Sequence, residues 1–489
     1  MNVIPTSPQA GGFAVERDPR LRFIIPGVVA VAFLMEQLDQ TIIVTAVPQM
    51  AESLATSALA LNLAVTTYIL ALAIFIPVSG WFADRFGARR VFVAALLIFT
   101  LGSVLCGMAV NFEMLIATRA LQGFGGAMMT PVGRLILIRS FPRSQLVTAM
   151  TYMTLPAILG PVIGPLLGGV ITTYLSWRWI FYVNIPFGII GIVMALRYVE
   201  DSVADHSAKF DFPGFLMVGI GFCLLEFGIE NISRPAIPLP GVVAALAGAG
   251  LLLAGFVVYA RRVAAPAVDL TLFRQRPFRV GTIFGGLSRV GLNGVPFLLP
   301  LMLQISLGIS PIISGAITFV SALSPLLVRP LLTPMLRRFG FGRVLIASAV
   351  AGALTVGSFA LVGPGTPYWL LAVLVGLFGL ARGAQFMTSN TLSYSDTPAA
   401  QLSRATSLGG VLQQLSVSFG VSIAAMLLGL VAGDSGVLTV DRFNEVFLIG
   451  AFVPLLGIPG FLMLRPEDGQ QVSGHRPRGV AEAIADAAE

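Results

Sequence analysis

Long apolar runs, separated by short stretches of charged residues, proline or glycine, fill most of the chain. Each run is close to the length of about 20 residues that an α-helix needs to cross the hydrocarbon core of a bilayer. The first run contains two acids and is too long for the apolar part of a cleaved signal peptide, so we expect it to remain as a span. We predict fourteen membrane-spanning helices, at residues 23–46, 61–83, 91–110, 114–133, 147–173, 179–199, 212–231, 240–260, 280–302, 311–334, 344–363, 367–390, 404–432 and 443–464. The expected fold class is an all-α polytopic membrane protein.

Basic residues between the runs predict the orientation. If the N-terminus is cytoplasmic, all but seven of the 30 Lys and Arg residues lie in cytoplasmic loops and tails. The exceptions are Arg178, Arg234 and Arg442 on the opposite face, and Arg119, Arg289, Arg329 and Arg382 within spans. This is the positive-inside bias of membrane proteins, and a missed helix would have inverted every later loop. We therefore expect cytoplasmic N- and C-termini in a bacterial inner membrane, with the loop arginines against anionic lipids.

Composition agrees with this interpretation. The chain is 56% hydrophobic and 11% charged, against about 45–50% and about 25% in soluble domains. The net charge of +7 is divided among short clusters that follow the membrane topology and does not form one patch. We therefore do not expect nucleic acid as a partner.

A weak internal repeat divides the chain into halves. The pattern Pro77…Asp84-Arg85-Phe86-Gly87…Arg90 recurs 253 residues later as Pro330…Arg337-Arg338-Phe339-Gly340…Arg343. Both copies end a span on the cytoplasmic side, which is typical of secondary transporters built from two similar halves. The predicted division is a cytoplasmic segment 1–22, a six-helix bundle 23–200, a linker with two additional helices 201–278, a six-helix bundle 279–465 and a cytoplasmic polar tail 466–489.

The loop between the second and third predicted helices carries a dense motif. Its glycines permit a tight turn, and its acid can pair with a cation of a neighbouring helix. The motif is Gly80-Trp81-Phe82-Ala83-Asp84-Arg85-Phe86-Gly87-Ala88-Arg89-Arg90. It closely resembles the cytoplasmic-loop signature of the major facilitator superfamily. The resemblance implies a gate loop in which Gly80, Asp84, Arg85, Gly87, Arg89 and Arg90 take part.

Three further stretches resemble the 14-helix drug:proton antiporter family of that superfamily. They are Leu38-Asp39-Gln40-Thr41-Ile42 through Pro48 in helix 1, Gly160-Pro161-Val162-Ile163-Gly164-Pro165-Leu166-Leu167-Gly168-Gly169 in helix 5, and Trp177-Arg178-Trp179-Ile180-Phe181 with Asn184, Pro186 and Gly188 at the start of helix 6. The chain departs from the family pattern at Val44, at Arg337 and in having the extra acid Glu36. The resemblance implies proton antiport by alternating access. We expect a monomer.

Charged residues inside the spans are the candidates for proton coupling. An ionised group at the bilayer centre costs roughly 2.5–3.5 kcal/mol, so it needs a partner or a polar cavity. Glu36 and Asp39 are three residues apart and share a face of helix 1, and acids that close resist simultaneous ionisation. Arg119 begins Arg119-Ala120-Leu121-Gln122-Gly123, which resembles the superfamily's helix-4 motif. We expect Asp39, Glu36 and Arg119 to couple protons; the alternative is a static ion pair between helices 1 and 4.

Small and polar residues in other spans predict packing and substrate contacts. The glycines of the helix-5 motif, with Pro161, Pro165 and Gly169, allow close helix approach and a bend. They predict either packing alone or a hinge between the halves. The predicted wall of a substrate cavity, with hydrogen bonding between helices as the alternative, is Gln40, Gln122, Arg289, Asn293, Gln385, Asn390 and Gln414. Glu226 is expected to be a pairing residue at the periphery.

Enzyme chemistry is not expected. The single lysine, Lys209, does not lie in a phosphate-binding motif, and His206 and His475 both lie outside the spans. No Cys/His cluster suggests a metal site, so we predict no catalytic residue, no metal and no cofactor.

The leading hypothesis is a proton-coupled exporter of amphipathic small molecules or drugs. Arg289, Arg329 and Arg382 motivate the alternative of an exporter of one anionic metabolite. A membrane sensor or scaffold that no longer transports is the hypothesis from another class.

Overall fold

The computed structural model describes residues 20–200, 210–233, 238–263, 266–398, 401–433 and 436–474. These ranges are almost entirely helical and contain no strand, which confirms the all-α prediction. The first six predicted spans correspond to α2 (Leu21–Ile42) with the 3-10 turn η1 (Ile43–Ala46) and α3 (Val47–Ser53), α4 (Asn62–Phe86), α5 (Ala88–Gly107), α6 (Phe112–Ser140), α7 (Arg143–Tyr174), and α8 (Trp179–Tyr182) with α9 (Asn184–Tyr198).

The remaining helices follow the predicted order. The two additional spans are α10 (Phe212–Asn231) and α11 (Leu239–Ala260). The ninth is a composite of α12 (Arg276–Arg279), the π-turn η3 (Val280–Phe284), α13 (Gly285–Leu301) and the π-turn η4 (Met302–Ser306), and it follows the short turn η2 (Leu270–Arg274). The last are α14 (Pro311–Ser358) with η5 (Phe359–Leu361), α15 (Tyr368–Ser395), α16 (Leu402–Ala432), and α17 (Val440–Gly450) with η8 (Val453–Gly457) and α18 (Ile458–Leu462).

Within the described ranges, eleven helices are long and apolar enough to cross a membrane. One of them, Pro311–Leu361, joins two predicted spans. Outside the eleven, α6 is 29 residues long but carries several charges, and α7 is 32 residues long and includes the apolar stretch Leu159–Tyr174. With the joined helix counted as two, the structure accounts for all fourteen predicted spans.

The repeated loop adopts the same turn in both halves. Gly87 ends α4 with φ 93° and ψ 135°, and Gly340 interrupts α14 with φ 75° and ψ 169°. Glycine tolerates such positive φ values because it has no Cβ. The two positions are 253 residues apart, so the sequence repeat is a structural repeat as well.

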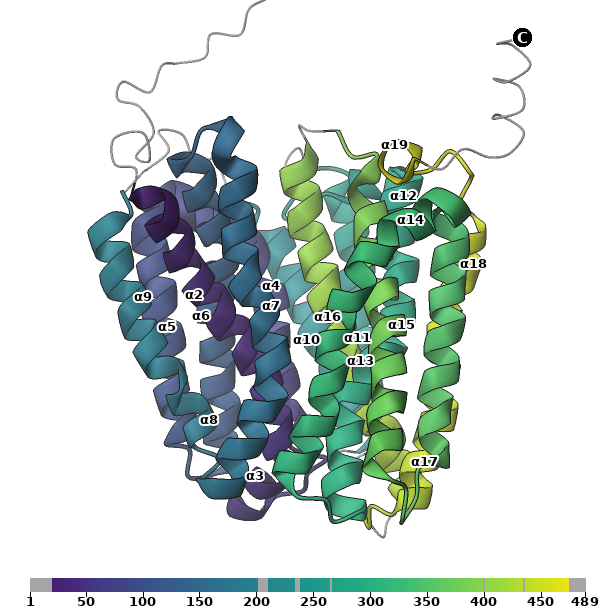
Figure 1. The fold of residues 1–489 in the computed structure, drawn as a ribbon. Coiled ribbons are helices and arrows are strands. Elements are labelled where there is room, and N and C mark those ends of the chain that lie inside the picture. The colour runs from purple at the N-terminus through teal and green to yellow at the C-terminus, as the bar shows by residue number, and fades with distance from the viewer. Residues whose placement is uncertain are drawn as a thin grey trace, which may run out of the picture.

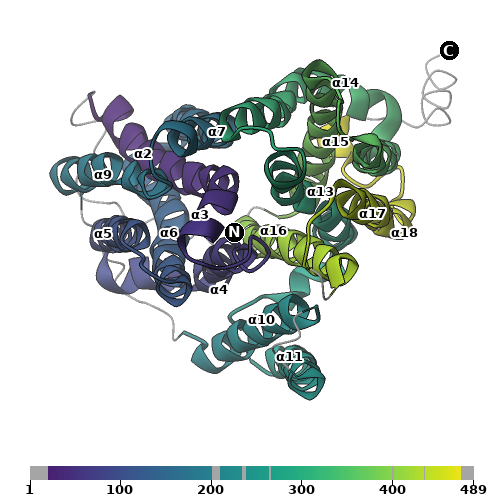
Figure 2. The same cartoon turned by 90° about the horizontal axis from the view of Figure 1, so that it is seen from below.

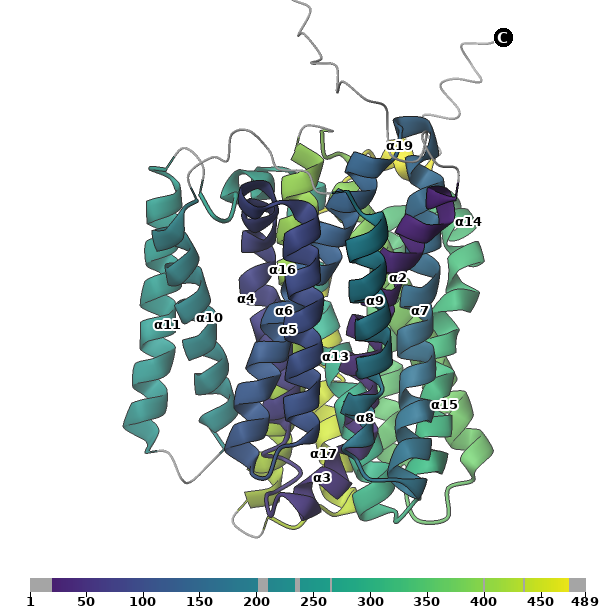
Figure 3. The same cartoon turned by 90° about the vertical axis from the view of Figure 1, so that its left-hand side faces the viewer.

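The helices form two groups with a hairpin beside them. Seen from below, α2 to α9 lie on one side and α12 to α18 on the other (Figures 1 and 2). The groups meet where α7 packs on α14 and α4 packs on α16. The pair α10 and α11 stands at the edge (Figure 3), and α10 packs against α4 and α16.

The polar segments at the ends are described only in part. Residues 1–19, the linker residues 201–209 and the tail residues 475–489 lie outside the described ranges. The described start of the tail includes α19 (Gln470–Ser473) and is held by an ion pair of Asp468 with Arg276 at 3.4 Å. This part of the tail therefore packs against the same end of the bundle as α12.

Candidate functional site

A buried ion pair joins the first and fourth spans. Asp39 on α2 is 1% exposed and Arg119 on α6 is fully buried. The guanidinium Nη1 of Arg119 donates to Asp39 Oδ2 at 2.5 Å. One turn along α6, Gln122 donates through Nε2 to Asp39 Oδ1 at 2.8 Å and accepts from Arg119 Nη1 at 2.8 Å. The predicted contact between Asp39 and Arg119 is confirmed.

Two further helices complete this network. Asn184 on α9 donates to Asp39 Oδ1 at 3.1 Å and to Ser103 Oγ at 3.0 Å. Ser103 on α5 also accepts from Gln122 at 3.2 Å. Sequence reasoning missed both residues as site residues, although Asn184 stood in the motif at the start of helix 6. Side chains of α6 and α9 thus donate three hydrogen bonds to the Asp39 carboxylate.

Arg119 has a mixture of partners, although its Nη2 has no hydrogen-bond partner among the described residues. Its Nε donates to the carbonyl of Ala64 on α4 at 2.9 Å, and its Cζ lies 4.2 Å from the centroid of the Tyr68 ring. The face of an aromatic ring attracts a cation. Because this guanidinium is fully buried, loss of Asp39 would leave a buried charge without its counter-ion.

Glu36 has a different environment from Asp39. It is 7% exposed and accepts a hydrogen bond from Thr130 Oγ1 at 2.5 Å. Arg134, one turn further along α6, acts on it electrostatically. Both acids are buried and face α6, as the shared-face prediction implies, but they do not share one cation: Arg119 pairs with Asp39 and Arg134 is near Glu36.

The predicted gate loop makes contacts inside the first group of helices. Asp84, near the end of α4, accepts from Arg139 Nη2 in the last turn of α6 at 2.7 Å. Arg89 Nη1 donates to the carbonyl of Val199, just after α9, at 3.4 Å. Asp84 does pair with a cation of a neighbouring helix, as expected, and that helix belongs to its own group.

The helix-5 glycines allow close approach on two sides. A Cβ added at Gly164 or Gly168 would collide with the Thr41 or Thr45 side chain of the first span. A Cβ at Gly169 would meet the backbone at Pro311, which begins α14. Close packing is therefore confirmed, and a hinge motion at this contact stays a prediction.

The predicted cavity residues separate into two sets. Arg382 Nη2 on α15 donates to Asn293 Oδ1 on α13 at 3.3 Å, and Arg289 lies with its Cζ 5.8 Å from the ring centroid of Phe386. Gln40, Asn390 and Gln414 are half-buried. By contrast, Gln385 is fully buried and accepts from Ser348 Oγ at 2.5 Å, so it joins α15 to α14. Gln122 belongs to the Asp39 network. Both glutamines thus make the hydrogen bonds between helices that were the alternative interpretation, and the cavity wall stays a prediction.

Comparison with known proteins places the chain in a family. The family model of the Major Facilitator Superfamily matches residues 29–421, and it matches residues 281–485 as well. The chain belongs to the Major Facilitator Superfamily. It is therefore a multi-span membrane protein of a transporter family, as the loop motif indicated.

Curated relatives and solved structures agree with this membership. Two relatives, from Salmonella heidelberg and Salmonella paratyphi A, are each 37% identical over 450 residues, which is 91% of this chain and 95% of the relative. Both bear the name "Putative multidrug resistance protein MdtD". The fold is similar to that of an auto inhibited POT family peptide transporter, with TM-score 0.67, 14% identity and coverage of 94% of this chain and 99% of that one. For the nucleoside transporter NupG the corresponding values are 0.56, 16%, 90% and 98%.

One of the two additional helices of this superfamily member, α10, carries two buried acids. Glu226 on α10 is 3% exposed and accepts from Ser418 Oγ at 2.8 Å and from Ser422 Oγ, both on α16. One turn further, Glu230 accepts from Thr66 Oγ1 on α4 at 2.6 Å. Glu226 is therefore at the buried seam between α10 and α16 and not peripheral. Sequence reasoning missed Glu230.

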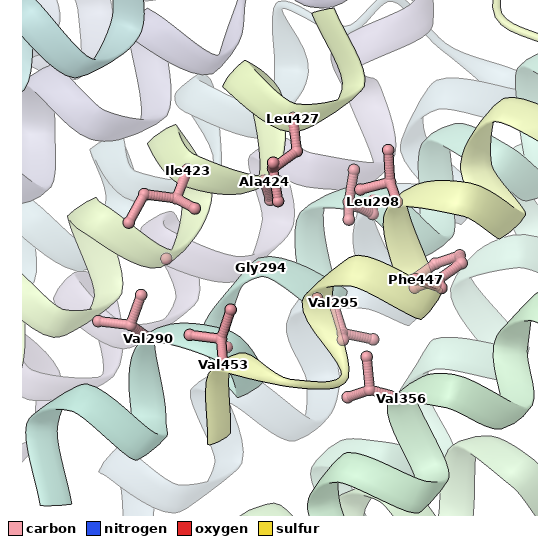
Figure 4. A pocket seen from close by; sticks show the side chains of 14 residues that line it. Val290, Gly294, Val295, Leu298, Val356, Ile423, Ala424, Leu427, Phe447 and Val453 are labelled. Atoms are coloured by element: carbon pink, nitrogen blue, oxygen red, sulfur yellow. The ribbon is translucent and has the colours of Figure 1, made fainter. Parts of the chain in front are cut away.

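An apolar pocket lies inside the second half of this superfamily fold. Side chains of α13, α16 and α17 surround it, among them Val290, Leu298, Ile423 and Phe447 (Figure 4). None of the predicted cavity residues lines it. A pocket without polar groups offers nothing to orient a charged or hydrogen-bonding ligand, so we assign it no role in transport.

Proposed function

We propose that this protein is a proton-coupled secondary exporter of amphipathic small molecules that works by alternating access. The observation that carries the proposal is the buried pair of Asp39 and Arg119. A proton carrier needs an acid that gains and loses its charge inside the membrane, and an intramembrane acid paired with arginine and amides is the expected form of such a site. The superfamily membership supports transport, and the name multidrug resistance protein of the two relatives supports drugs as cargo.

The coupling step follows from the contacts of Asp39. When Asp39 binds a proton it loses its attraction for Arg119, and the pair that holds α2 to α6 is weakened. The same helix α2 packs against α7, which in turn meets α14 of the other group. A change of position of α2 is therefore transmitted to the contact between the halves. Glu36 and the gate pair of Asp84 with Arg139 act in the same movement.

The proton gradient supplies enough energy for export. One proton crossing about 150 mV yields roughly 3.5 kcal/mol, and one pH unit adds about 1.4 kcal/mol. In one-for-one exchange, that supports a gradient above roughly a thousandfold for a neutral substrate.

The proposed exporter has two moving bodies, a defined location in the cell and a small set of partners. The moving bodies are residues 23–200 and 279–465, with 201–278 carrying the additional helices and 1–22 and 466–489 as cytoplasmic ends. The protein is a monomer in a bacterial inner membrane, with anionic lipids against its cytoplasmic arginines. Small molecules and protons are its partners, without nucleic acid or cofactor.

The test is substrate-induced proton release. The purified protein is reconstituted in liposomes with a pH-sensitive dye in the lumen, and a chemically diverse panel of amphipathic compounds is added. Compounds that are transported should shift the lumenal pH in the wild type and leave it unchanged in Asp39→Asn. Transport of a compound with no proton movement in the wild type would refute the proposed coupling.

A further inference from the structure

Two arginines in the second half are not balanced by acids. Arg289 on α13 is 6% exposed and Arg382 on α15 is half-buried. Within the described residues neither forms an ion pair, whereas Arg119 in the first half has Asp39. A buried cation without a counter-ion is strongly unfavourable. Arginines that are buried without an acid beside them therefore indicate a ligand of opposite charge.

The helices α13 and α15 pack against each other in antiparallel orientation, and this brings further polar groups without hydrogen-bond partners close together. Arg382 reaches Asn293, Phe386 lies beside Arg289, and Ser389 abuts the backbone of Gly285. Among the described residues, five buried polar atoms on these two helices have no hydrogen-bond partner. They are Arg289 Nε, Ser288 Oγ, Gln385 Nε2, Thr388 Oγ1 and Ser389 Oγ. All five can donate a hydrogen bond, and buried donors are nearly always paired in folded proteins.

Arg289 acts on a residue that an arginine of the other half also reaches. Arg289 and Arg134 of α6 both act electrostatically on Tyr394 of α15. Arg134 is exposed, although it lies between Glu36 of its own half and Tyr394 of the opposite half. This guanidinium therefore acts on one group of each half. An anion beside Tyr394 is therefore attracted from both halves at once.

Apolar surface accompanies these cations. Phe386 lies beside Arg289, and Phe33 lies 5.5 Å from the Cζ of Arg134. We propose that Arg289 and Arg382, with Ser288, Thr388 and Ser389, form the polar part of the cargo site, and that the cargo is an organic anion: a carboxylate or a similar oxyanion on an apolar body. Guanidinium groups bind such oxyanions through two parallel hydrogen bonds. This inference rests on the proposed function and specifies its substrate class.

The experiment compares matched compounds that differ only in charge. For several apolar bodies, such as naphthyl, indolyl and decyl, the carboxylate, the primary amide and the ammonium form are tested for binding to the purified protein in uncharged detergent. The expected result is binding of one or more carboxylates, with at least tenfold weaker binding of the matched amide and ammonium. Arg289→Ala should lower the affinity for the carboxylate at least tenfold, and Arg289→Lys should restore part of it.

Three comparisons make the result decisive. Thr388→Val and Ser389→Ala remove single donors and should weaken carboxylate binding a few-fold, which keeps the test valid if Arg289→Ala does not fold. Arg338→Ala removes an exposed arginine of α14, outside the site, and should leave affinity unchanged. Binding in liposomes with and without anionic phosphatidylglycerol distinguishes a lipid headgroup: competition by the lipid that abolishes carboxylate binding would overturn the assignment to cargo.

The outcomes also separate this inference from the proposed function. Preferred binding of amide or ammonium forms, or no binding by any carboxylate, overturns the anion site and leaves proton-coupled export untouched. Carboxylate binding that depends on Arg289 but moves no protons in liposomes supports the anion site and refutes the coupling.

Discussion

Replacing Asp39 by asparagine tests the coupling site directly. The change keeps the size of the side chain and its hydrogen bonds from Gln122 and Asn184, and it removes the charge that faces Arg119. Removing one partner of a buried ion pair destabilises a protein by about 3–5 kcal/mol. Because the acceptor oxygen remains, we expect a loss near the lower end, about 3 kcal/mol in the free energy of unfolding in detergent.

A second variant separates stability from coupling. Asp39→Asn combined with Arg119→Gln leaves no buried charge without a partner, so it should regain most of the stability that the single change loses. It should not regain coupled transport, since no group at the site changes its charge. Restored coupling in the stable double variant would show that the pair is only a structural connection between α2 and α6.

Transport is measured in everted membrane vesicles. A pH gradient should drive accumulation of substrate by the wild type, and Asp39→Asn should bring the accumulation ratio to about one, while exchange of labelled for unlabelled substrate persists. If Asp39→Asn still concentrates substrate against a gradient, the proton is carried elsewhere, and Glu36 and Glu226 become the candidates.

Further predictions concern the gate, the packing, the additional helices and the topology. Asp84→Asn should leave the protein in the membrane but slow substrate exchange, and exchange at the wild-type rate would reduce the loop to a topology signal. Gly168→Leu should lower the free energy of unfolding by about 2 kcal/mol or more, whereas Gly250→Leu, at an open position of α11, should not. Glu226→Gln should stay within about 1 kcal/mol of the wild type and Glu226→Leu should lose about 2 kcal/mol, and equal stabilities would show that the seam with α16 contributes little. Reporters at Gly365 and in the C-terminal tail should report opposite faces of the membrane; the same face would contradict the predicted orientation.

The sequence predicted best the features that have few alternative explanations. A charge inside an apolar run needs a partner or a polar cavity, and Arg119 stood in a recognisable helix-4 motif, so Asp39 and Arg119 could be matched before their contact was known. The glycines at 87 and 340 occur in a repeated motif at a span end, and a tight turn is what such a motif needs. In both cases local sequence was sufficient, because the membrane leaves few other ways to satisfy the groups.

Details of helix rotation and register were not accessible in the same way. A polar residue such as Gln385 faces a cavity or a neighbouring helix according to how its helix is rotated, and the sequence alone does not determine that rotation. Glu36 has Thr130 as its partner because of the register between α2 and α6. Glu230 stands at the end of a predicted span, where an acid is unremarkable, and only the packing of α10 on α4 reveals that it is buried.

The positions of the charged groups also constrain how an anionic cargo is coupled to protons. At a shared site a proton and an anion favour each other's binding, because each neutralises the other, and this gives joint transport and not exchange. Exchange therefore requires separate sites linked by the conformational change. The structure provides this separation: Asp39 is hydrogen-bonded to α6 and α9 of the first half, and Arg289 lies in the second. Arg134 acts electrostatically on both Glu36 and Tyr394 of the second half, so we expect Glu36 to tune anion binding and Asp39 to carry the exchanged proton.

Separate sites also make exchange strongly dependent on voltage. Proton entry and anion exit each move one positive charge equivalent inward, so a potential of about 150 mV contributes roughly 3.5 kcal/mol for each. A neutral cargo receives only the first contribution. In everted vesicles at equal pH, a valinomycin-imposed potential, lumen positive, should therefore concentrate a carboxylate cargo far more than its matched amide. Equal accumulation of the carboxylate and the amide would contradict an anionic cargo exchanged for a proton. If Asp39→Asn removes the voltage response of the amide but keeps that of the carboxylate, the carboxylate is transported without a counter-moving proton.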